Sequence, residues 1–376
     1  MNLLIDFGAI KTGGGVQLAT NFLARVQDNN RHMINKLFLL VPDSGPLSEI
    51  DLHGLCDDFA YYPNSYFKRK VFEITHLSRF LRRNRVDTIY TFFGAGLPRY
   101  KGVRSVVSVA YPIICYPDSP YWHYVSFFPS SKKKLVNALR RKRIRSAEKV
   151  VVETEVMAGR INRYVGVAKQ KIQVIPPSPS EFLPNRPFSP RTASVARILL
   201  LSGVDLHKNL WRLPAIAAQL SKKTQIPFLF RISVTKEQFL SSTPKFIELE
   251  PEILERYFEF FGAVPAEDIG AVYSDSDLLL NASDLESFSN NYMEAWKAGL
   301  PLVCSDTDFS RHICGNSAVY IDPHDAESAA ERIASLLESN DMQSSLVSEG
   351  KSRLHSLPDS IQKFDLIWSA LKNDID

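Results

Sequence analysis

Short apolar runs alternate along the chain with longer stretches whose apolar residues recur at helical spacing. Short runs bounded by turn residues are typical of buried strands, and the longer stretches are typical of helices that cover a sheet. The predicted strands of the first half are 2–7, 37–41, 88–92, 103–110, 149–153 and 172–175. Those of the second half are 198–202, 228–233, 257–261, 278–281, 302–304 and 319–321.

Helical stretches fall between these runs in both halves of the chain. The predicted helices are 16–26, 71–85, 210–220, 290–297, 326–339 and an amphipathic last helix, 360–372. Regular alternation of strands and helices favours parallel sheets with helices on both faces. The pattern therefore predicts an α/β protein with two Rossmann-like domains.

Prolines separate the two halves. They lie at positions 176, 177, 179, 184, 187 and 190. Proline fixes φ and lacks an amide donor, so regular structure should stop there. We predict an N-terminal domain over 1–180, a linker over 181–196, a C-terminal domain over 197–356 and a terminal helical segment over 357–376.

Composition agrees with a globular protein of about two domains, because 376 residues exceed the usual size of one core. The apolar fraction of 45% excludes a chain that is disordered throughout. The four cysteines form no CxxC pair, which argues against a zinc ribbon or a disulfide scaffold. The chain starts without a basic, apolar leader and has no apolar run of 18 residues, so we expect a cytoplasmic location.

The net charge of +4 hides a strong asymmetry. Between Tyr66 and Arg145 there are 18 basic and 3 acidic residues. The densest part holds Lys132, Lys133, Lys134, Arg140, Arg141, Lys142 and Arg143. Aromatic residues crowd the segment just upstream, and this mixture suits an anionic membrane surface. A solvated helical face is an equal alternative, whereas nucleic acid is less favoured because no nucleic-acid-binding motif is present.

The most specific signal lies between 261 and 303. Glu286 precedes a predicted helix and Glu294 lies one turn inside it, after a buried strand over 278–281. Ligands of parallel sheets bind at the carboxyl ends of strands, and a helix N-terminus offers free amides to an anion. Ser289, Asn290 and Asn291 occupy that N-terminus. Two glutamates eight residues apart are also common by chance in surface or capping positions.

The region resembles the retaining glycosyltransferases of family 4, which have the GT-B fold. The resemblance rests on a Glu-x7-Glu motif formed by Glu286 and Glu294, followed by Ala295, Gly299 and Pro301. It implies two Rossmann-like domains with parallel sheets that face a central cleft, and a last helix that crosses back to the first domain. It also implies that Glu286 contacts hydroxyls of the donor sugar and that Glu294 holds the ribose. Phe288-Ser289 stands where the family has Phe-Gly.

A second stretch, 201–210, supports the same resemblance. Gly203 and Lys208 match a loop in which the family places an arginine and a lysine against the leaving diphosphate. The arginine position is Val204 here, and we consider His207 or Arg311 as a substitute. We expect Lys208 and Glu286 to be the catalytic residues. Taken alone, Lys208 would read as a solvated lysine at a helix start.

Two further motifs have weaker meaning. Gly13, Gly14 and Gly15 precede the first helix, and the resemblance implies a loop near phosphate and acceptor. An ordinary strand-to-helix turn is the alternative. Asp275-Ser276-Asp277 has the form of a metal-binding DxD motif, but its place before a buried strand favours a solvated turn. We therefore expect no metal and no cofactor.

The family also places a histidine after the strand that corresponds to 103–110, near the acceptor. This chain has Tyr111 there, and the next histidine is His123. We assign both to the acceptor side.

The sequence thus predicts a retaining, metal-independent hexosyltransferase that moves sugar from a nucleotide diphosphate sugar, most simply a UDP- or GDP-sugar. The acceptor would be a glycan or a lipid-linked molecule of bacterial surface polysaccharide, such as O-antigen, capsule or lipopolysaccharide. The enzyme would be cytoplasmic or peripheral on the inner face of the cytoplasmic membrane, without a nucleic-acid partner. A non-catalytic sugar-nucleotide-binding or scaffold protein of the same fold is the alternative.

Overall fold

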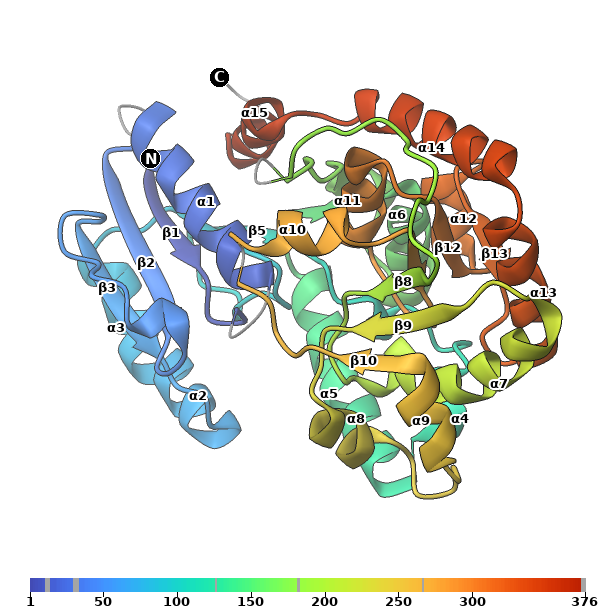
Figure 1. Cartoon of the computed structure of the whole chain (residues 1–376). Helices are drawn as coiled ribbons and strands as arrows, with labels where there is room; N and C mark the ends of the chain where they lie inside the picture. Colours follow the sequence, from blue (N-terminus) through green and yellow to red (C-terminus); the bar gives the residue numbers. More distant parts are fainter. Residues whose placement is uncertain (11–13, 30–33, 126, 181–182, 266, 373–376) are drawn as a thin grey trace. The chain divides into compact units, whose positions relative to one another are not determined.

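The computed structural model describes residues 1–10, 14–29, 34–125, 127–180, 183–265 and 267–372. The chain divides into two compact units (Figure 1). Unit 1 comprises Met1–Pro117, Phe127–Pro176 and Asp359–Asp376, and unit 2 comprises Asp118–Ser126 and Pro177–Pro358. Each unit is described by itself below.

Unit 1 is built on one parallel sheet. Its strands are β1 (Asn2–Asp6), β2 (Lys36–Pro42), β3 (Asp58–Tyr62), β4 (Thr88–Thr91), β5 (Arg104–Ser108), β6 (Lys149–Val152) and β7 (Ile172–Val174). They lie in the order β3-β2-β1-β4-β5-β6-β7. The strand order reverses between β1 and β4, which is where open parallel sheets bind ligands.

Helices cover both faces of this sheet. They are α1 (Gly14–Asn29), α2 (Tyr66–Phe72), α3 (Ser78–Arg83), α5 (Phe127–Arg145), α6 (Glu155–Arg160) and α15 (Ser360–Leu371). A π-helical turn over Glu73–Leu77 joins α2 to α3. Leu3 and Ile5 belong to a core on one face, whereas Leu4 belongs to the core on the other, since successive strand residues point to opposite faces.

Unit 2 repeats the plan with a six-stranded parallel sheet in the order β10-β9-β8-β11-β12-β13. Its strands are β8 (Ala196–Leu200), β9 (Phe228–Ile232), β10 (Phe258–Phe260), β11 (Leu278–Asn281), β12 (Leu302–Ser305) and β13 (Val319–Ile321). Its helices are α4 (Tyr121–Tyr124), α7 (Leu213–Lys223), α8 (Lys236–Ser242), α9 (Pro251–Tyr257), α10 (Ile269–Ser274), α11 (Asn290–Ala298), α12 (Asp308–Cys314), α13 (Ala326–Leu337) and α14 (Asn340–His355).

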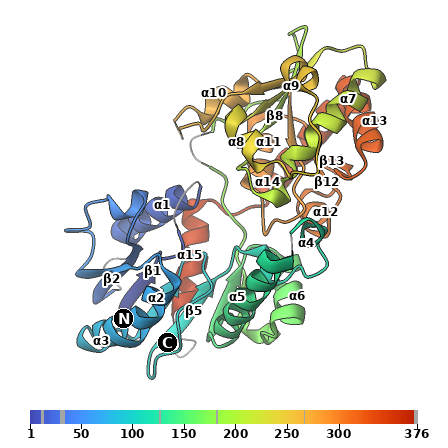
Figure 2. The ribbon, with the colours of Figure 1, turned by 90° about the horizontal axis from the view of Figure 1, so that it is seen from below.

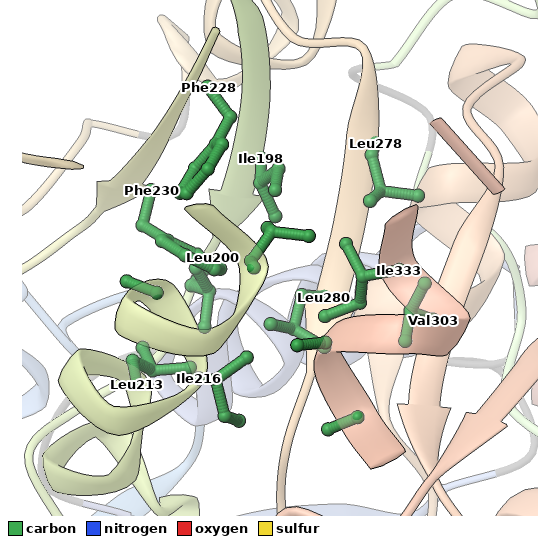
Figure 3. Close-up of a cluster of buried hydrophobic side chains, with 14 of the residues drawn as sticks. Ile198, Leu200, Leu213, Ile216, Phe228, Phe230, Leu278, Leu280, Val303 and Ile333 are labelled. Atoms are coloured by element: carbon green, nitrogen blue, oxygen red, sulfur yellow. The ribbon is translucent and has the colours of Figure 1, made fainter. Parts of the chain in front are cut away.

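The core of unit 2 explains why its strands read as continuous apolar runs. Ile198 and Leu200 of β8 pack with Leu278 and Leu280 of β11 beneath helices α7 and α13 (Figure 3). Leu199 and Leu279 instead join the core on the opposite face, beside α11. Strands buried on both faces need apolar residues at every position, as parallel sheets do. The predicted two-domain α/β architecture is confirmed.

The last helix returns to the first sheet. Phe364, Ile367 and Trp368 of α15 are buried in a core of unit 1, and Arg25 of α1 donates a 3.1 Å hydrogen bond to the Ser360 hydroxyl. Figure 2 shows this red helix among the blue and green elements of unit 1. The prediction that the terminal helix crosses back to the first domain is therefore confirmed.

Two features were not anticipated from the sequence. Edge strand β3 is largely half-buried, so it lacks the apolar run that marks the inner strands. The segment 118–126 lies in unit 2 although it was included in the first domain. Tyr124 of this segment bonds the Nδ1 atom of His324 at 2.9 Å, and the Nε2 atom of His324 lies 2.9 Å from Asp284 Oδ1.

Candidate functional site

The candidate donor site lies where the strand order of unit 2 reverses, between β8 and β11. The segments that leave these two strands are tied together by two hydrogen bonds to backbone carbonyls. Asn209, in left-handed conformation with φ 57°, donates a 2.9 Å hydrogen bond from Nδ2 to the Ala282 carbonyl. The Asp284 amide donates to the His207 carbonyl at 2.8 Å. These bonds hold both segments at the edge where ligands of such sheets bind.

Lys208 and Glu286 meet at this edge. The Lys208 Nζ atom donates to Glu286 Oε1 at 2.5 Å, and both side chains are partly buried, with 23% and 13% of their surface exposed. Lys208 ends a 3₁₀ turn over Leu206–Lys208 whose geometry is fixed by Asn209. The structure thus brings together the two residues predicted to be catalytic.

Helix α11 points a set of unpaired amides at the same loop. Ser289 is its N-cap residue, and the amides of Asn290 and Asn291 have no acceptor among the residues that the structure describes. The Ser289 hydroxyl accepts a 2.9 Å hydrogen bond from Asn281, so this side chain turns back toward β11. The amides at the start of the helix are therefore available to an anion.

Two predicted donor residues have structural contacts of their own, and a third lies in open space. The Asn291 side chain donates to the Leu201 carbonyl at 2.7 Å and so ties α11 to the end of β8. Phe288 packs partly buried against the core beside Tyr292. Gly203 is open, because a Cβ at this position would have no neighbour within 4 Å.

Glu294 is held inside the first turns of α11. Its Oε2 atom accepts a 2.7 Å hydrogen bond from the Tyr273 hydroxyl, which comes from α10. Burial raises the pKa of Glu294, and the bond from Tyr273 opposes that rise. Its Oε1 atom accepts no hydrogen bond from any residue in the described ranges, and remains able to accept one from a ligand hydroxyl.

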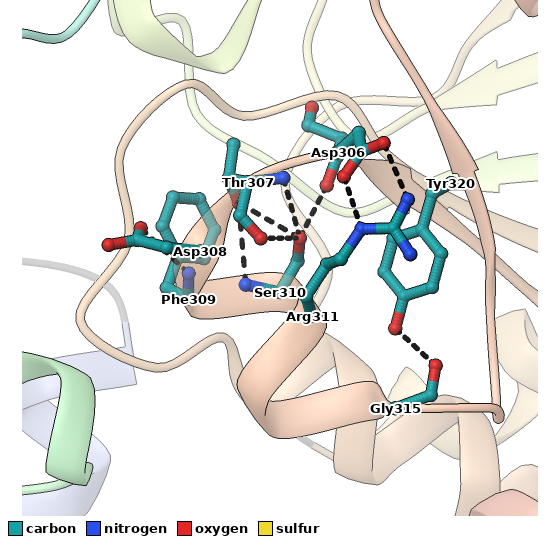
Figure 4. A network of polar contacts seen from close by, with 9 residues as sticks. Asp306, Thr307, Asp308, Phe309, Ser310, Arg311, Gly315 and Tyr320 are labelled. Carbon is teal, nitrogen blue, oxygen red and sulfur yellow. Dashed lines mark hydrogen bonds and ion pairs between the residues drawn. The ribbon is translucent and has the colours of Figure 1, made fainter.

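Neither proposed substitute for the missing arginine provides a spare cation. Val204 is 39% exposed at the end of the β8 loop. Arg311 is paired with both carboxylate oxygens of Asp306 and lies 4.3 Å from the ring centre of Tyr320 (Figure 4). Burial and the neighbouring Lys208 lower the pKa of His207, so its ring is neutral near pH 7. Lys208 is thus the cation that the structure assigns to this loop.

The aspartates of the DxD-like motif have protein partners. Asp275 accepts ion pairs from Arg197 and Arg231, and Asp277 accepts a 2.8 Å hydrogen bond from the Arg197 amide. Both carboxylates therefore fasten the turn before β11 to neighbouring strands. Among the residues described, no group of three or more His, Cys, Asp or Glu side chains could hold a metal ion.

The glycine loop is described only in part. Gly13 lies outside the described residues, and Gly14 begins α1. Gly15 follows in the first turn, where a Cβ would make ordinary contact with Ile10. Protein packing therefore does not require glycine at position 15, and the role of this loop stays a prediction.

A pocket of about 280 Å³ lies in unit 1 where its strand order reverses between β1 and β4. Asp6 ends β1 in this pocket and accepts hydrogen bonds from the Gly8 amide at 2.9 Å and the Thr91 hydroxyl at 3.0 Å. Burial raises the pKa of Asp6 to about 6. Tyr111, predicted on the acceptor side, lines the pocket, whereas His123 lies on α4 in unit 2. No sequence motif pointed to Asp6, because a single acid at a strand end is common.

The predicted basic patch divides on helix α5. Lys132, Lys133, Lys134 and Lys142 are exposed, and Arg141 is half-buried. Arg140 and Arg143 instead line the pocket of unit 1. Arg140 and Arg143 are thus set apart from the exposed lysines, since a helix turns residues 140 and 143 to a different face from 142, and the membrane patch stays a prediction. Within the described parts of the chain, no helix has both the length and the apolar composition needed to cross a bilayer.

Comparison with known proteins finds a matching glycosyltransferase family for each half of the chain. The profile of the family Glycosyl transferases group 1 matches residues 197–353, and that of Glycosyltransferase Family 4 matches 13–178. A curated relative, the O-antigen chain mannosyltransferase B of Escherichia coli, is 27% identical over 84 residues. That match spans 22% of this chain and 22% of the relative's length.

Two solved structures share the fold over nearly the whole chain. One is WaaG, a glycosyltransferase involved in lipopolysaccharide biosynthesis, with 13% identity, a TM-score of 0.71 and coverage of 98% of both chains. The other is HepE of Anabaena in complex with UDP and glucose, with 13% identity, a TM-score of 0.68 and coverage of 99% of both chains. The similarity confirms the predicted GT-B fold.

Proposed function

We propose that this chain, which belongs to the group 1 glycosyl transferases, moves a sugar from a nucleotide diphosphate sugar with retention of the anomeric configuration and without a metal. The observation that carries the proposal is the 2.5 Å contact between Lys208 and Glu286 beside the unpaired amides of α11. A cation and free amides suit a leaving diphosphate, and a carboxylate suits sugar hydroxyls.

In this proposal, different residues of unit 2 bind the diphosphate, the donor sugar and the ribose. Lys208 and the amides of Asn290 and Asn291 stabilise the negative charge that develops on the diphosphate as the glycosidic bond breaks. Glu286 accepts hydrogen bonds from the donor sugar, and Glu294 Oε1 accepts them from the ribose. An acceptor hydroxyl forms the new bond on the face that the diphosphate leaves, and its proton passes to the leaving phosphate. Retention follows because both bonds lie on the same face.

Metal independence is supported by the contacts of the carboxylates. Asp275 and Asp277 already bond Arg197 and Arg231, so these carboxylates are poorly placed to bind a divalent cation at the diphosphate. Lys208 provides positive charge where other enzymes use a metal ion.

The acceptor in this proposal is a glycan or lipid-linked molecule of bacterial surface polysaccharide, bound by unit 1. The exposed lysines of α5 support peripheral attachment to the inner face of the cytoplasmic membrane. Apolar side chains add to this support, since Phe67 on α2 is 76% exposed and Leu135 on α5 is 66% exposed. The partial match to an O-antigen mannosyltransferase of Escherichia coli is consistent with this substrate class.

A thermal-shift screen with UDP-, GDP-, ADP- and CDP-sugars tests the donor assignment. A bound donor raises the unfolding temperature, because it binds only the folded state. We expect one nucleotide class to raise it, and we expect Glu286→Gln and Lys208→Ala to reduce the rise. A rise that neither substitution weakens would show that the donor lies elsewhere.

Val204 favours one alternative function. With valine exposed at the position of the family's arginine, the site has one cation fewer for the leaving group. A protein that binds a sugar nucleotide without transferring it would fit this change. It would give the thermal shift with no release of nucleotide diphosphate over time, which distinguishes it from an enzyme.

A further inference from the structure

The pocket of unit 1 is lined by four cations and two acids. Arg69 and Lys70 come from α2, and Arg140 and Arg143 come from α5. The acids are Asp6 and Glu73. The pocket lies at the carboxyl edge of a parallel sheet, where sheets of this kind bind their ligands.

The acids neutralise only part of this charge. Glu73 is buried and accepts bonds from Arg143 at 2.7 Å, Lys70 at 3.5 Å and the Tyr62 hydroxyl at 2.5 Å. Asp6 is bonded to Gly8 and Thr91. Both acids are thus committed to protein partners, and neither is paired with Arg69 or Arg140.

Arg69 and Arg140 are held in place without an acid. Arg69 donates from Nε to the Pro63 carbonyl at 2.6 Å and lies 4.8 Å from the ring centre of Tyr62. Arg140 lies 4.4 Å from the ring centre of Tyr111 and donates to the Asn137 side chain at 3.2 Å. Neither guanidinium forms an ion pair with any residue that the structure describes. Stacking and single hydrogen bonds leave most of their donors available.

We propose that Arg69 and Arg140 bind a phosphate group of the acceptor in this pocket, an inference that rests on the proposed function of unit 1 as the acceptor side. Two fixed guanidiniums favour a group with several anionic oxygens, because each can donate two parallel hydrogen bonds. A neutral sugar hydroxyl would leave both cations uncompensated in a half-buried site. Tyr111 contributes by fixing the plane of Arg140.

The phosphate has two possible sources, a lipid and a soluble ester. Exposed apolar residues next to the pocket favour a lipid, since Phe67 and Tyr66 on α2 and Leu139 on α5 are all exposed. Tyr66 and Leu139 also line the pocket itself. The shared chemistry is a phosphate ester whose remaining part extends past these apolar side chains.

The test measures binding of two probes to the full chain near pH 7.5. Mannose 6-phosphate probes a soluble ester. Calorimetry measures its binding, and mannose is the neutral control. Flotation with phosphatidylcholine vesicles that carry phosphatidic acid probes a lipid phosphate. For the double variant Arg69→Gln/Arg140→Gln, we expect affinity for the responding probe to fall about tenfold or more, as loss of charged hydrogen bonds predicts.

Matched variants make the result specific. Lys222→Gln/Lys236→Gln removes the same charge from exposed positions of α7 and α8, outside the lysines of α5 proposed to meet a membrane, and should leave the affinity within about twofold, because exposed charges interact weakly. Lys208→Ala should reduce donor binding and leave probe binding intact. Thermal unfolding shows whether each variant folds. If the double variant does not fold, Arg140→Lys replaces it, because lysine preserves the charge.

The proposal is overturned if the double variant binds both probes as the wild type does, if the wild type binds neither, or if the two lysine substitutions cause an equal loss. Loss of probe binding in Lys208→Ala would also overturn it, because the phosphate would then occupy the donor site of unit 2. Donor binding by the double variant is scored separately. If the double variant still binds the donor, a failure of the phosphate-binding proposal does not contradict the proposed transferase function.

Discussion

Lys208 Nζ lies 2.5 Å from Glu286 Oε1, and this contact joins the segment after β8 to the loop after β11. The two strands are neighbours in the sheet, so residues 78 positions apart in the chain meet at one edge. The pair is preorganised before any ligand binds. A donor that places its diphosphate at α11 meets a fixed cation rather than a mobile lysine, which lowers the cost of binding.

Removing the cation should weaken the donor site. For Lys208→Ala, we expect donor affinity to fall about 10- to 100-fold, since a charge-assisted contact to the diphosphate is lost and Glu286 is left as a partly buried, unpaired acid. Calorimetry with the donor found by the screen measures this. The matched control is Lys222→Ala at an exposed position of α7, which should leave affinity unchanged. An equal loss in both variants would remove Lys208 from the site.

Tyr273 should tune the ribose contact through Glu294. Phenylalanine at 273 removes the donor of the 2.7 Å bond that favours the charged form, so the pKa of Glu294 should rise further. We expect Tyr273→Phe to weaken donor binding severalfold, and more at pH 6 than at pH 8, because a higher pKa leaves more of the acid protonated as the pH falls. Glu294→Gln should weaken donor binding equally at both pH values, because glutamine does not ionise. A Tyr273→Phe variant with the same loss at both pH values would contradict this role.

Asn209 should stabilise unit 2 through its backbone conformation and its side chain. Asn209→Ala loses the bond to the Ala282 carbonyl and places alanine at φ 57°, which together should lower the free energy of unfolding by about 2 kcal/mol. Asn209→Gly loses the bond but adopts this conformation without strain, so its loss should be smaller. Denaturant unfolding curves measure both. Alanine that is tolerated as well as glycine would show that the left-handed turn is not strained.

Asp6 should make the stability of the protein depend on pH. Its folded pKa of about 6 lies above the ordinary aspartate pKa of 3.8, so its protonated form favours the folded state. This contribution is complete below about pH 4 and is lost as pH rises through 6. Relative to wild type, Asp6→Asn should therefore gain up to about 3 kcal/mol between pH 4 and pH 7. Denaturant curves at four pH values test this, and a pH-independent difference would contradict it.

The sequence predicted most of what is buried and little of what is polar. Inner strands such as β8 and β11 were predictable because burial on both faces requires an apolar run. Edge strand β3 was missed since its residues are only half-buried. Glu286 and Glu294 were found through a spaced motif, whereas Asp6, Glu73 and Arg69 come from separate elements that only the fold assembles. Charge counting grouped Arg140 with the lysines of α5, although the helix turns it toward the pocket.

The central claim is that unit 2 breaks the bond between sugar and diphosphate on a path that retains configuration and needs no metal. Early-time proton NMR of donor hydrolysis in the presence of EDTA tests this most directly. With an α-linked donor, we predict that the α anomer appears first, that EDTA leaves the rate unchanged, and that Glu286→Gln slows the reaction at least about a hundredfold. First appearance of the β anomer, abolition of the reaction by EDTA, or an unchanged rate in Glu286→Gln would contradict the account.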